Sequence, residues 1–448
     1  MSKTYVGFGR YDITPEEYGP MAGLGGDGGR IASIVLDQLF GTCVAFRDEA
    51  GESFVLCTFD LLHPYKEHVT DALRERLSKA TGIAPERFMI CATHNHAGPT
   101  CSSPWDPRIA AFLERFYKQM TKAALEAIED LAEAEIYVGS KHVENMNFTR
   151  HYITNDGMPF GTGLGSSKTG FKSHLCPADD LLQLMRFKRK DRRDIVLVNW
   201  GAHVTIVGAT YADTQISADY PGAMRTHIEG MTGCHVAFFQ SAAGNVGTYS
   251  RIEELNRIKD KKDFRAYGRT LAEEAMQIID DLAPVKSGPV RVKKLIKQIP
   301  IDHSQDHLAE HAAEALRLYE EAEGMEPRER VQILRDRGYR HDTHALMITR
   351  RSQMDAHDEM ELNALCAGDI SFVTAPYEMF ASNGRFIKDN TPFPMTFVIS
   401  DSNNTQGYIP DKQGCQYLTY EYTNRFYPAG TGEELADTFV DMLKEIKE

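Results

Sequence analysis

Short apolar runs alternate with amphipathic helical patterns along most of the 448-residue chain. The apolar runs are rich in Val, Ile and Phe, which is typical of buried β-strands. They predict strands at 41–46, 53–59, 88–92, 135–139, 195–200, 235–239, 290–299, 361–365, 370–374 and 395–399. Apolar residues at helical spacing predict helices at 65–81, 108–132, 221–231, 264–282 and 433–447. This alternation predicts an α/β (mixed α+β) fold in which mixed β-sheets are flanked by helices.

The segment 306–340 differs from the rest of the chain because it is dense in Ala, Glu, Leu and Arg. Its pattern predicts two surface helices with a break near residues 324–327, and therefore a helical insertion. Charged helical faces usually face water, so a solvated helical pair is the favoured interpretation. A contribution to a pocket edge or to a dimer contact is the alternative.

Composition and charge narrow the class of protein. Lys and Arg number 50 against 64 Asp and Glu, a formal charge of −14. This balance disfavours nucleic acid and stable membrane association, because both select clustered cations. Without a signal-peptide-like N-terminus or an apolar run near the roughly 20 residues that span a bilayer, we expect a cytoplasmic protein. The eight cysteines are scattered and form no CxxC motif, which favours buried free thiols.

The sharpest chemical feature is the run CATHNHAGP at residues 91–99, where a predicted strand ends in His94 and His96. Residues two apart on a strand point to the same side, so both imidazoles can address one point. Histidine is the commonest metal ligand, and a neutral imidazole suits zinc. The motif alone leaves a metal site and two hydrogen-bonding loop histidines equally open. A second strand delivers His203 at its end, where a lone histidine is more often structural.

Further candidates follow other predicted strands. The small residues of 239–247 offer backbone N–H groups to an anion or an oxyanion, or simply make a tight connection. Glu378 follows the strand at 370–374 and is open as a zinc ligand, a general base or, as the default, a first-turn acid of a helix. Tyr408 and Tyr420 lie in predicted loops, where single tyrosines usually serve packing.

Taken together and in chain order, these segments resemble the neutral/alkaline (non-lysosomal) ceramidase family in its N-terminal catalytic domain. The opening run VGFGRYDIT resembles the family's G-x-G-R-x-D-I-T, and HNHAGP resembles its H-T-H-S-G-P. The stretch from Asn199 to His203 resembles a family segment that ends in one histidine, and Pro-Tyr-Glu at 376–378 resembles its Pro-Gly-Glu. Tyr408 and Tyr420 match two tyrosines at the family's twelve-residue spacing. The resemblance covers residues from about 5 to 430.

The resemblance implies a zinc amidase with one Zn²⁺ per chain. Its implied zinc ligands are His94, His203, Glu378 and Tyr408. It places His96 to handle a proton and Tyr420 beside the developing oxyanion. Arg150 stands two positions from the family's arginine in an Asn-x-Asn-Arg context, and Gly247 replaces a family serine. Because the implied ligands are far apart in sequence, one catalytic domain over 1–448 is expected, without the family's C-terminal immunoglobulin-like domain.

The function predicted from these residues is a zinc-dependent hydrolase that cleaves an amide or ester bond of a small soluble molecule with metal-activated water. Two alternatives stay open: a zinc-dependent lyase or isomerase acting on a sugar-like substrate, and a non-catalytic zinc- or ligand-binding homologue. Specificity is expected in the segments 19–30, 151–173 and 306–340. The first of these is glycine-rich and is predicted to be a mobile loop near the site. A homo-oligomer is left open.

Overall fold

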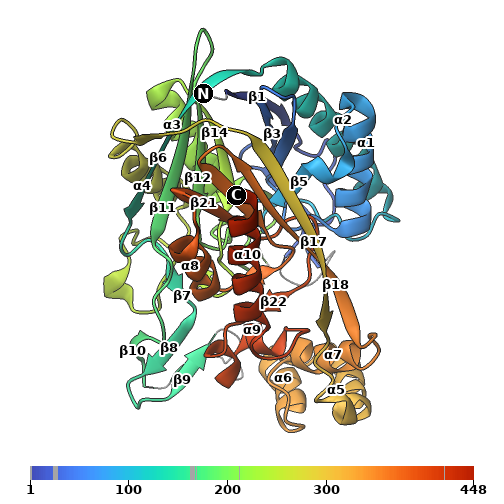
Figure 1. Cartoon of the computed structure of the whole chain (residues 1–448). Helices are drawn as coiled ribbons and strands as arrows, with labels where there is room; N and C mark the ends of the chain where they lie inside the picture. Colours follow the sequence, from blue (N-terminus) through green and yellow to red (C-terminus); the bar gives the residue numbers. More distant parts are fainter. Residues whose placement is uncertain (1–2, 24–28, 162–166, 168, 211, 418) are drawn as a thin grey trace.

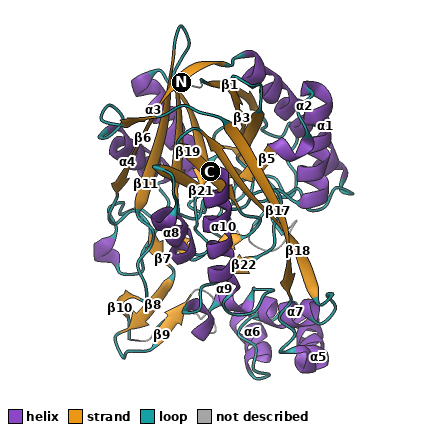
Figure 2. Cartoon of the chain, viewed as in Figure 1, coloured by secondary structure: helices purple, strands orange, loops and turns teal. Residues whose placement is uncertain are grey.

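A large, strongly bent β-sheet and a smaller sheet pack face to face, and helices cover the outer face of each (Figures 1 and 2). The computed structural model describes residues 3–23, 29–161, 167, 169–210, 212–417 and 419–448. The faces between the two sheets share one apolar core, in which Phe46 and Phe187 of the large sheet lie with Phe372 of the smaller one. The predicted α/β fold with mixed sheets flanked by helices is therefore confirmed.

The large sheet has the strand order β14-β12-β11-β6-β1-β3-β4-β5, with β16 paired to β6. Its strands are β1 (Thr4–Asp12), β3 (Phe40–Asp48), β4 (Ser53–Phe59), β5 (Phe88–Ala92), β6 (Ala132–His142), β11 (Leu181–Arg189), β12 (Ile195–Trp200), β14 (His235–Gln240) and β16 (Ala283–Val285). The pairs β4–β5 and β12–β14 are parallel and the others are antiparallel.

The apolar pattern missed β1 and β11. In β1, the glycines interrupt the hydrophobic run for a packing reason. A Cβ added to Gly7 would lie 1.9 Å from the carbonyl oxygen of Ala127, and one added to Gly9 would lie 2.1 Å from that of Ala123. The helix α2 (Pro107–Glu129) therefore sits directly on the strand backbone, which only glycine permits.

The smaller sheet has the order β17-β18-β19-β21, with bounds Val290–Pro300, His357–Ala367, Ile370–Thr374 and Met395–Ile399. Short pairs complete the strands: β2 (Ile34–Val35) with β13 (Gln215–Ile216), β7 (Phe148–Thr149) with β15 (Val246–Gly247), and β20 (Glu378–Met379) with β22 (Tyr408–Ile409). A separate three-stranded sheet joins β8 (His151–Thr154), β9 (Pro159–Gly161) and β10 (Phe171–His174). The four strands of the smaller sheet coincide with predicted runs, whereas the short strands of the pairs and of the three-stranded sheet were not predicted.

Four helices cover the large sheet: α1 (Ala72–Thr81) and α2 on one half, α3 (Asp219–Thr232) and α4 (Phe264–Met276) on the other. On the smaller sheet lie α8 (Ala381–Asn390) and α10 (Thr431–Lys447). The short α9 (Tyr420–Thr423) precedes α10. The helix predicted at 65–81 begins instead with a π-helical turn, Lys66–Asp71, before α1.

The segment 306–340 contains the two predicted helices, α5 (Ala309–Glu321) and α6 (Pro327–Arg335), which are separated close to the predicted break. A third helix, α7 (Asp342–Arg351), follows beyond the predicted limit at residue 340, and the three together are called the insertion below. The three helices share a small core of their own at the lower end of the molecule in Figure 1. The insertion is thus a packed unit that also contacts the rest of the chain.

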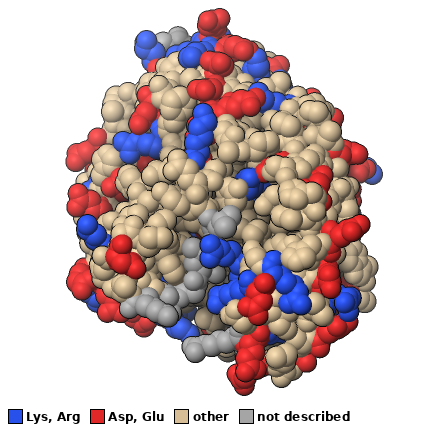
Figure 3. Space-filling view, turned by 90° about the horizontal axis from the view of Figure 1, so that it is seen from below, with Lys and Arg blue, Asp and Glu red and all other residues tan. Residues whose placement is uncertain are grey.

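All eight cysteines are free thiols, as predicted; six of them are buried, but Cys176 and Cys415 are only half-buried. No helix within the described ranges is both long and apolar enough to cross a bilayer. The lower face carries side chains of both signs, and Lys and Arg gather near its middle although the chain is acidic overall (Figure 3).

Candidate metal centre

The His-x-His motif lies just beyond the carboxyl end of β5, in a loop. The expectation that a strand would align the two histidines is therefore wrong, because β5 ends at Ala92. His94 instead adopts a left-handed backbone with φ 63°, a conformation that is uncommon for residues other than glycine and recurs at functional sites. The two side chains still converge, with their Nε2 atoms 3.3 Å apart.

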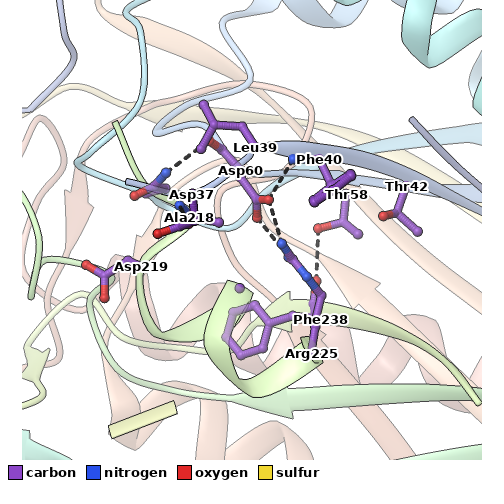
Figure 4. Close-up of polar contacts among 12 residues, drawn as sticks. Asp37, Leu39, Phe40, Thr42, Thr58, Asp60, Ala218, Asp219, Arg225 and Phe238 are labelled. Atoms are coloured by element: carbon purple, nitrogen blue, oxygen red, sulfur yellow. Dashed lines mark hydrogen bonds and ion pairs between the residues drawn. The ribbon is translucent and has the colours of Figure 1, made fainter. Parts of the chain in front are cut away.

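Asn95, between the two histidines, fixes this loop from behind. Its side-chain amide donates to the carbonyl oxygens of Asp60 at 3.1 Å and Ser217 at 2.7 Å. The Asp60 carboxylate pairs in turn with both terminal nitrogens of Arg225, at 2.8 and 2.6 Å, and both side chains are buried (Figure 4). The loop that carries the histidines thus rests on a buried, bidentate ion pair.

His203 follows β12 and faces the same point as His94, with 4.5 Å between the ring centroids. Its Nδ1 donates to the carbonyl oxygen of Ala243 at 2.7 Å, so its Nε2 carries the lone pair. Burial, together with the charge of Arg150, lowers the pKa of His203 to about 3 and keeps the ring neutral. The segment 239–247, predicted to offer N–H groups to an anion or to connect two elements, supplies carbonyl oxygens to this histidine.

Glu378 and Tyr408 are opposite each other in the parallel pair β20–β22. The helical interpretation of Glu378 is therefore wrong, since the residue lies in a strand and α8 begins three residues later. Burial raises the pKa of the Glu378 carboxyl, and the neighbouring His94 opposes that shift. Two short strands thus bring together residues that are thirty positions apart in the chain.

The acceptor atoms at this point fit a metal ion. The Glu378 Oε2 lies 3.2 Å from His203 Nε2 and 3.5 Å from His94 Nε2. Both Glu378 Oε2 and His203 Nε2 are buried, and neither has a hydrogen-bond partner within the described part of the chain. A carboxylate oxygen and an imidazole lone pair so close together repel each other unless a cation or a proton lies between them. Nitrogen atoms of His94, His96 and His203 also lie within 4.8 Å of one another.

Arg150 links Tyr408 and Glu421 at the edge of this cluster. Its Nη2 lies 2.8 Å from the Glu421 carboxylate and donates to the carbonyl oxygen of Gly244 at 2.6 Å. Burial opposes its charge, but Glu421 and a hydrogen bond with Tyr408 raise the pKa of the guanidinium. Tyr420 completes the group, with its ring 5.8 Å from that of Tyr408.

Three residues of the site were not predicted from the sequence: His63, Asp401 and Glu421. The Asp401 carboxylate lies 3.3 Å from His94 Nδ1 and 3.6 Å from His63 Nδ1. Burial opposes its ionisation, but the two histidines hold the pKa of Asp401 well below its usual range. Glu421 is fully buried between Arg150 and His151. For Asp401 the sequence did hold a signal: a carboxylate two residues after the strand predicted at 395–399.

The glycine-rich segment 19–30 borders the site, as expected, although residues 24–28 lie outside the described residues. Gly23 has φ 97°, and a Cβ there would come within 2.6 Å of His96 Nδ1. Arg30 donates to the carbonyl oxygen of His96 at 2.8 Å. Of the segment 151–173, residues 162–166 and 168 lie outside the described residues, and the remainder forms most of the sheet β8–β10.

The fold and this cluster define a class: mixed α/β proteins with a buried histidine–carboxylate site that could hold a metal ion. Two solved structures share the fold along the entire chain. One is neutral ceramidase from Pseudomonas aeruginosa, with TM-score 0.70 and 17% identity over 100% of this chain and 75% of that one. The other is a ceramidase complexed with C2, with TM-score 0.70 and 17% identity over 100% and 76% of the two chains.

No protein-family model and no curated protein sequence matches the chain. The resemblance inferred from the motifs is therefore confirmed by structure, at the level of the fold.

Proposed function

We propose that this protein is a zinc-dependent hydrolase that cleaves an amide bond of a small molecule. The observation that carries the proposal is the meeting of His94, His203 and Glu378 in a buried cluster beside two tyrosines, where His203 Nε2 and Glu378 Oε2 face each other without a hydrogen-bond partner among the described residues. The shared fold with neutral ceramidases supports it. A catalytic domain that spans residues 1–448, and action in the cytoplasm on a soluble substrate, are parts of the same proposal.

In this proposal His94, His203, Glu378 and Tyr408 hold the zinc ion. When bound, zinc supplies a Lewis acid for the carbonyl group and lowers the pKa of a water molecule toward about 7. The protein prepares both histidines for this role. Asp401 orients His94 through its Nδ1, and the carbonyl oxygen of Ala243 fixes the tautomer of His203.

Tyrosine is an unusual zinc ligand, and the groups around Tyr408 change the pKa of its hydroxyl. Burial and the nearby Glu378 carboxylate raise the pKa of the Tyr408 hydroxyl well above its usual range. Arg150, which forms a hydrogen bond with this phenol, lowers that pKa. We assign Arg150 to positioning: it ties Tyr408 to Glu421 and balances the negative charge of the cluster.

His96 and Tyr420 are not zinc ligands in this proposal, and we assign them to contacts with the substrate. His96 Nδ1 is buried without a hydrogen-bond partner among the described residues, and burial and the adjoining histidines lower the pKa of the ring well below its usual range. A neutral imidazole accepts a proton and passes it to the leaving nitrogen. Burial raises the pKa of Tyr420 to about 12, which keeps its hydroxyl protonated and able to donate to an oxyanion.

The proposal is tested with zinc-loaded protein and a library of amides graded by acyl-chain length. Hydrolysis in ¹⁸O-labelled water should place the label in the released acid, because water attacks the carbonyl carbon. Cleavage without the label would point to a lyase, and the absence of any cleavage would overturn the proposal. Activity on short or polar amides and none on long acyl chains would support a soluble substrate.

A further inference from the structure

The helical insertion reaches the candidate site through the N-terminus of α7. His341 is the N-cap of this helix, and its Nδ1 accepts a hydrogen bond from the backbone N–H of His344 at 3.1 Å. A ring nitrogen that accepts carries no proton, so the proton of the neutral ring is on Nε2. Nε2 lies 3.0 Å from the Thr423 hydroxyl and therefore donates to it.

The Thr423 hydroxyl links His341 to the backbone of Tyr420. Its oxygen lies 2.9 Å from the carbonyl oxygen of Tyr420, to which its own proton is free to point. The His341 ring also packs against the Tyr420 ring, with centroids 5.5 Å apart. The Tyr420 ring also lies 5.8 Å from the ring of Tyr408. Tyr420 is thus held between a residue of the insertion and a residue of the candidate metal centre.

The other end of α7 is fixed to the same segment. Arg351, the last residue of α7, is buried and donates to the carbonyl oxygen of Arg425 at 2.7 Å and to Gln305 at 2.7 Å. Arg425 forms an ion pair with Asp302, which precedes the insertion. Both ends of α7 are therefore attached to the short stretch that contains α9 and Tyr420.

We propose that His341 is a positioning residue, through which the insertion sets the place of the Tyr420 hydroxyl for the reaction. The proposal rests on the proposed function, in which Tyr420 donates to the oxyanion. If the proposal holds, the insertion contributes to the edge of the site, as in the alternative interpretation of its sequence, and does not only face solvent. A donor displaced by about 1 Å can cost about 100-fold in rate, so a residue that fixes the ring matters even without touching the substrate.

The principal variant is His341→Asn. Asparagine is among the best N-caps, so the variant keeps the start of α7, but its side chain is too short to reach Thr423 or to cover the Tyr420 ring. We expect kcat to fall about tenfold or more, with KM and bound zinc little changed. His311→Asn is the matched control, because His311 lies on α5 of the same insertion and contacts Tyr339 instead. It should leave kcat unchanged.

A double-mutant cycle separates positioning from an independent effect. If His341 acts through Tyr420, His341→Asn should have little further effect on kcat in a Tyr420→Phe protein. Thr423→Val should lower kcat as His341→Asn does, and Thr423→Ser, which keeps the hydroxyl, should restore it. Fully multiplicative effects, or normal kcat in both His341→Asn and Thr423→Val, would overturn the proposal.

A measurement that needs no activity separates this inference from the proposed function. In protein labelled with 3-fluorotyrosine, the ¹⁹F signal that disappears in Tyr420→Phe belongs to Tyr420. That signal should shift or broaden in His341→Asn and keep its position in His311→Asn. If zinc-loaded wild type cleaves no amide, the proposed function fails while this signal still reports on the contact. An unmoved signal overturns the inference by itself.

Discussion

Replacing Asp401 with asparagine should weaken zinc binding without disturbing the backbone. Asp401 has φ 50°, and asparagine tolerates this left-handed conformation as well as aspartate does. The substitution removes the negative charge that lies 3.3 Å from His94 Nδ1, while the size of the side chain is kept. Both side chains are only 3% exposed, so water replaces the lost interaction poorly.

The expected loss of zinc affinity follows from the position of the Asp401 carboxylate beside a proposed zinc ligand, His94. Removal of a partner that orients a metal-ligating histidine typically costs 10- to 100-fold in metal affinity, or about 1.4–2.7 kcal/mol. The assay is competition between metal-free protein and a chromophoric zinc chelator, which gives the zinc dissociation constant of each variant. Asp191→Asn is the matched control, because Asp191 also has a left-handed backbone, with φ 58°, but is exposed. Unchanged affinity in Asp401→Asn, or equal weakening in the control, would refute the reasoning.

Two further predictions concern acid stability and the departure at position 247. Glu361 pairs with Arg74 at 2.8 Å; burial opposes its ionisation, yet this pair holds its pKa at about 2. The ionised Glu361 therefore stabilises the folded protein at neutral pH, and this stabilisation is lost as the pH falls from about 4.3 toward 2. The difference in unfolding free energy between wild type and Glu361→Gln, measured by urea titration, should therefore shrink from pH 7 to pH 3. A difference independent of pH would contradict this. The Gly247→Ser variant should fold and bind zinc normally, because an added Cβ meets only the Arg150 side chain, at 3.6 Å. Loss of zinc from this variant, measured by metal analysis, would contradict the prediction.

The elements of the fold were predictable where the apolar pattern is strong. The strands that deliver the site, β5 and β12, match the predicted ranges because they are buried on both faces and read as continuous apolar runs. Strand β1 was not predictable from this pattern. Its glycines allow α2 to pack directly on the strand backbone, and they interrupt the apolar run that would have indicated a strand. The third insertion helix was missed because the charged pattern gives little information on where such a unit ends.

The site was predictable only in part. His94, His96 and His203 lie in loops that follow predicted strands, where side chains from separate segments meet. Glu378 and Tyr408 needed the resemblance, because the two-residue pair β20–β22 is too short to leave a pattern in the sequence. Asp401, Glu421 and His341 act through contacts between segments distant in the chain, and such contacts depend on tertiary packing.

The central claim is that a zinc ion held by His94, His203 and Glu378 is required for amide hydrolysis. Its most direct test is the stepwise addition of zinc to metal-free protein, with zinc content and hydrolysis of a responsive amide followed together. The account predicts that activity in the wild type rises to a plateau at about one zinc per chain, and that His203→Ala neither retains zinc nor gains activity. Full activity of the metal-free wild type would contradict it.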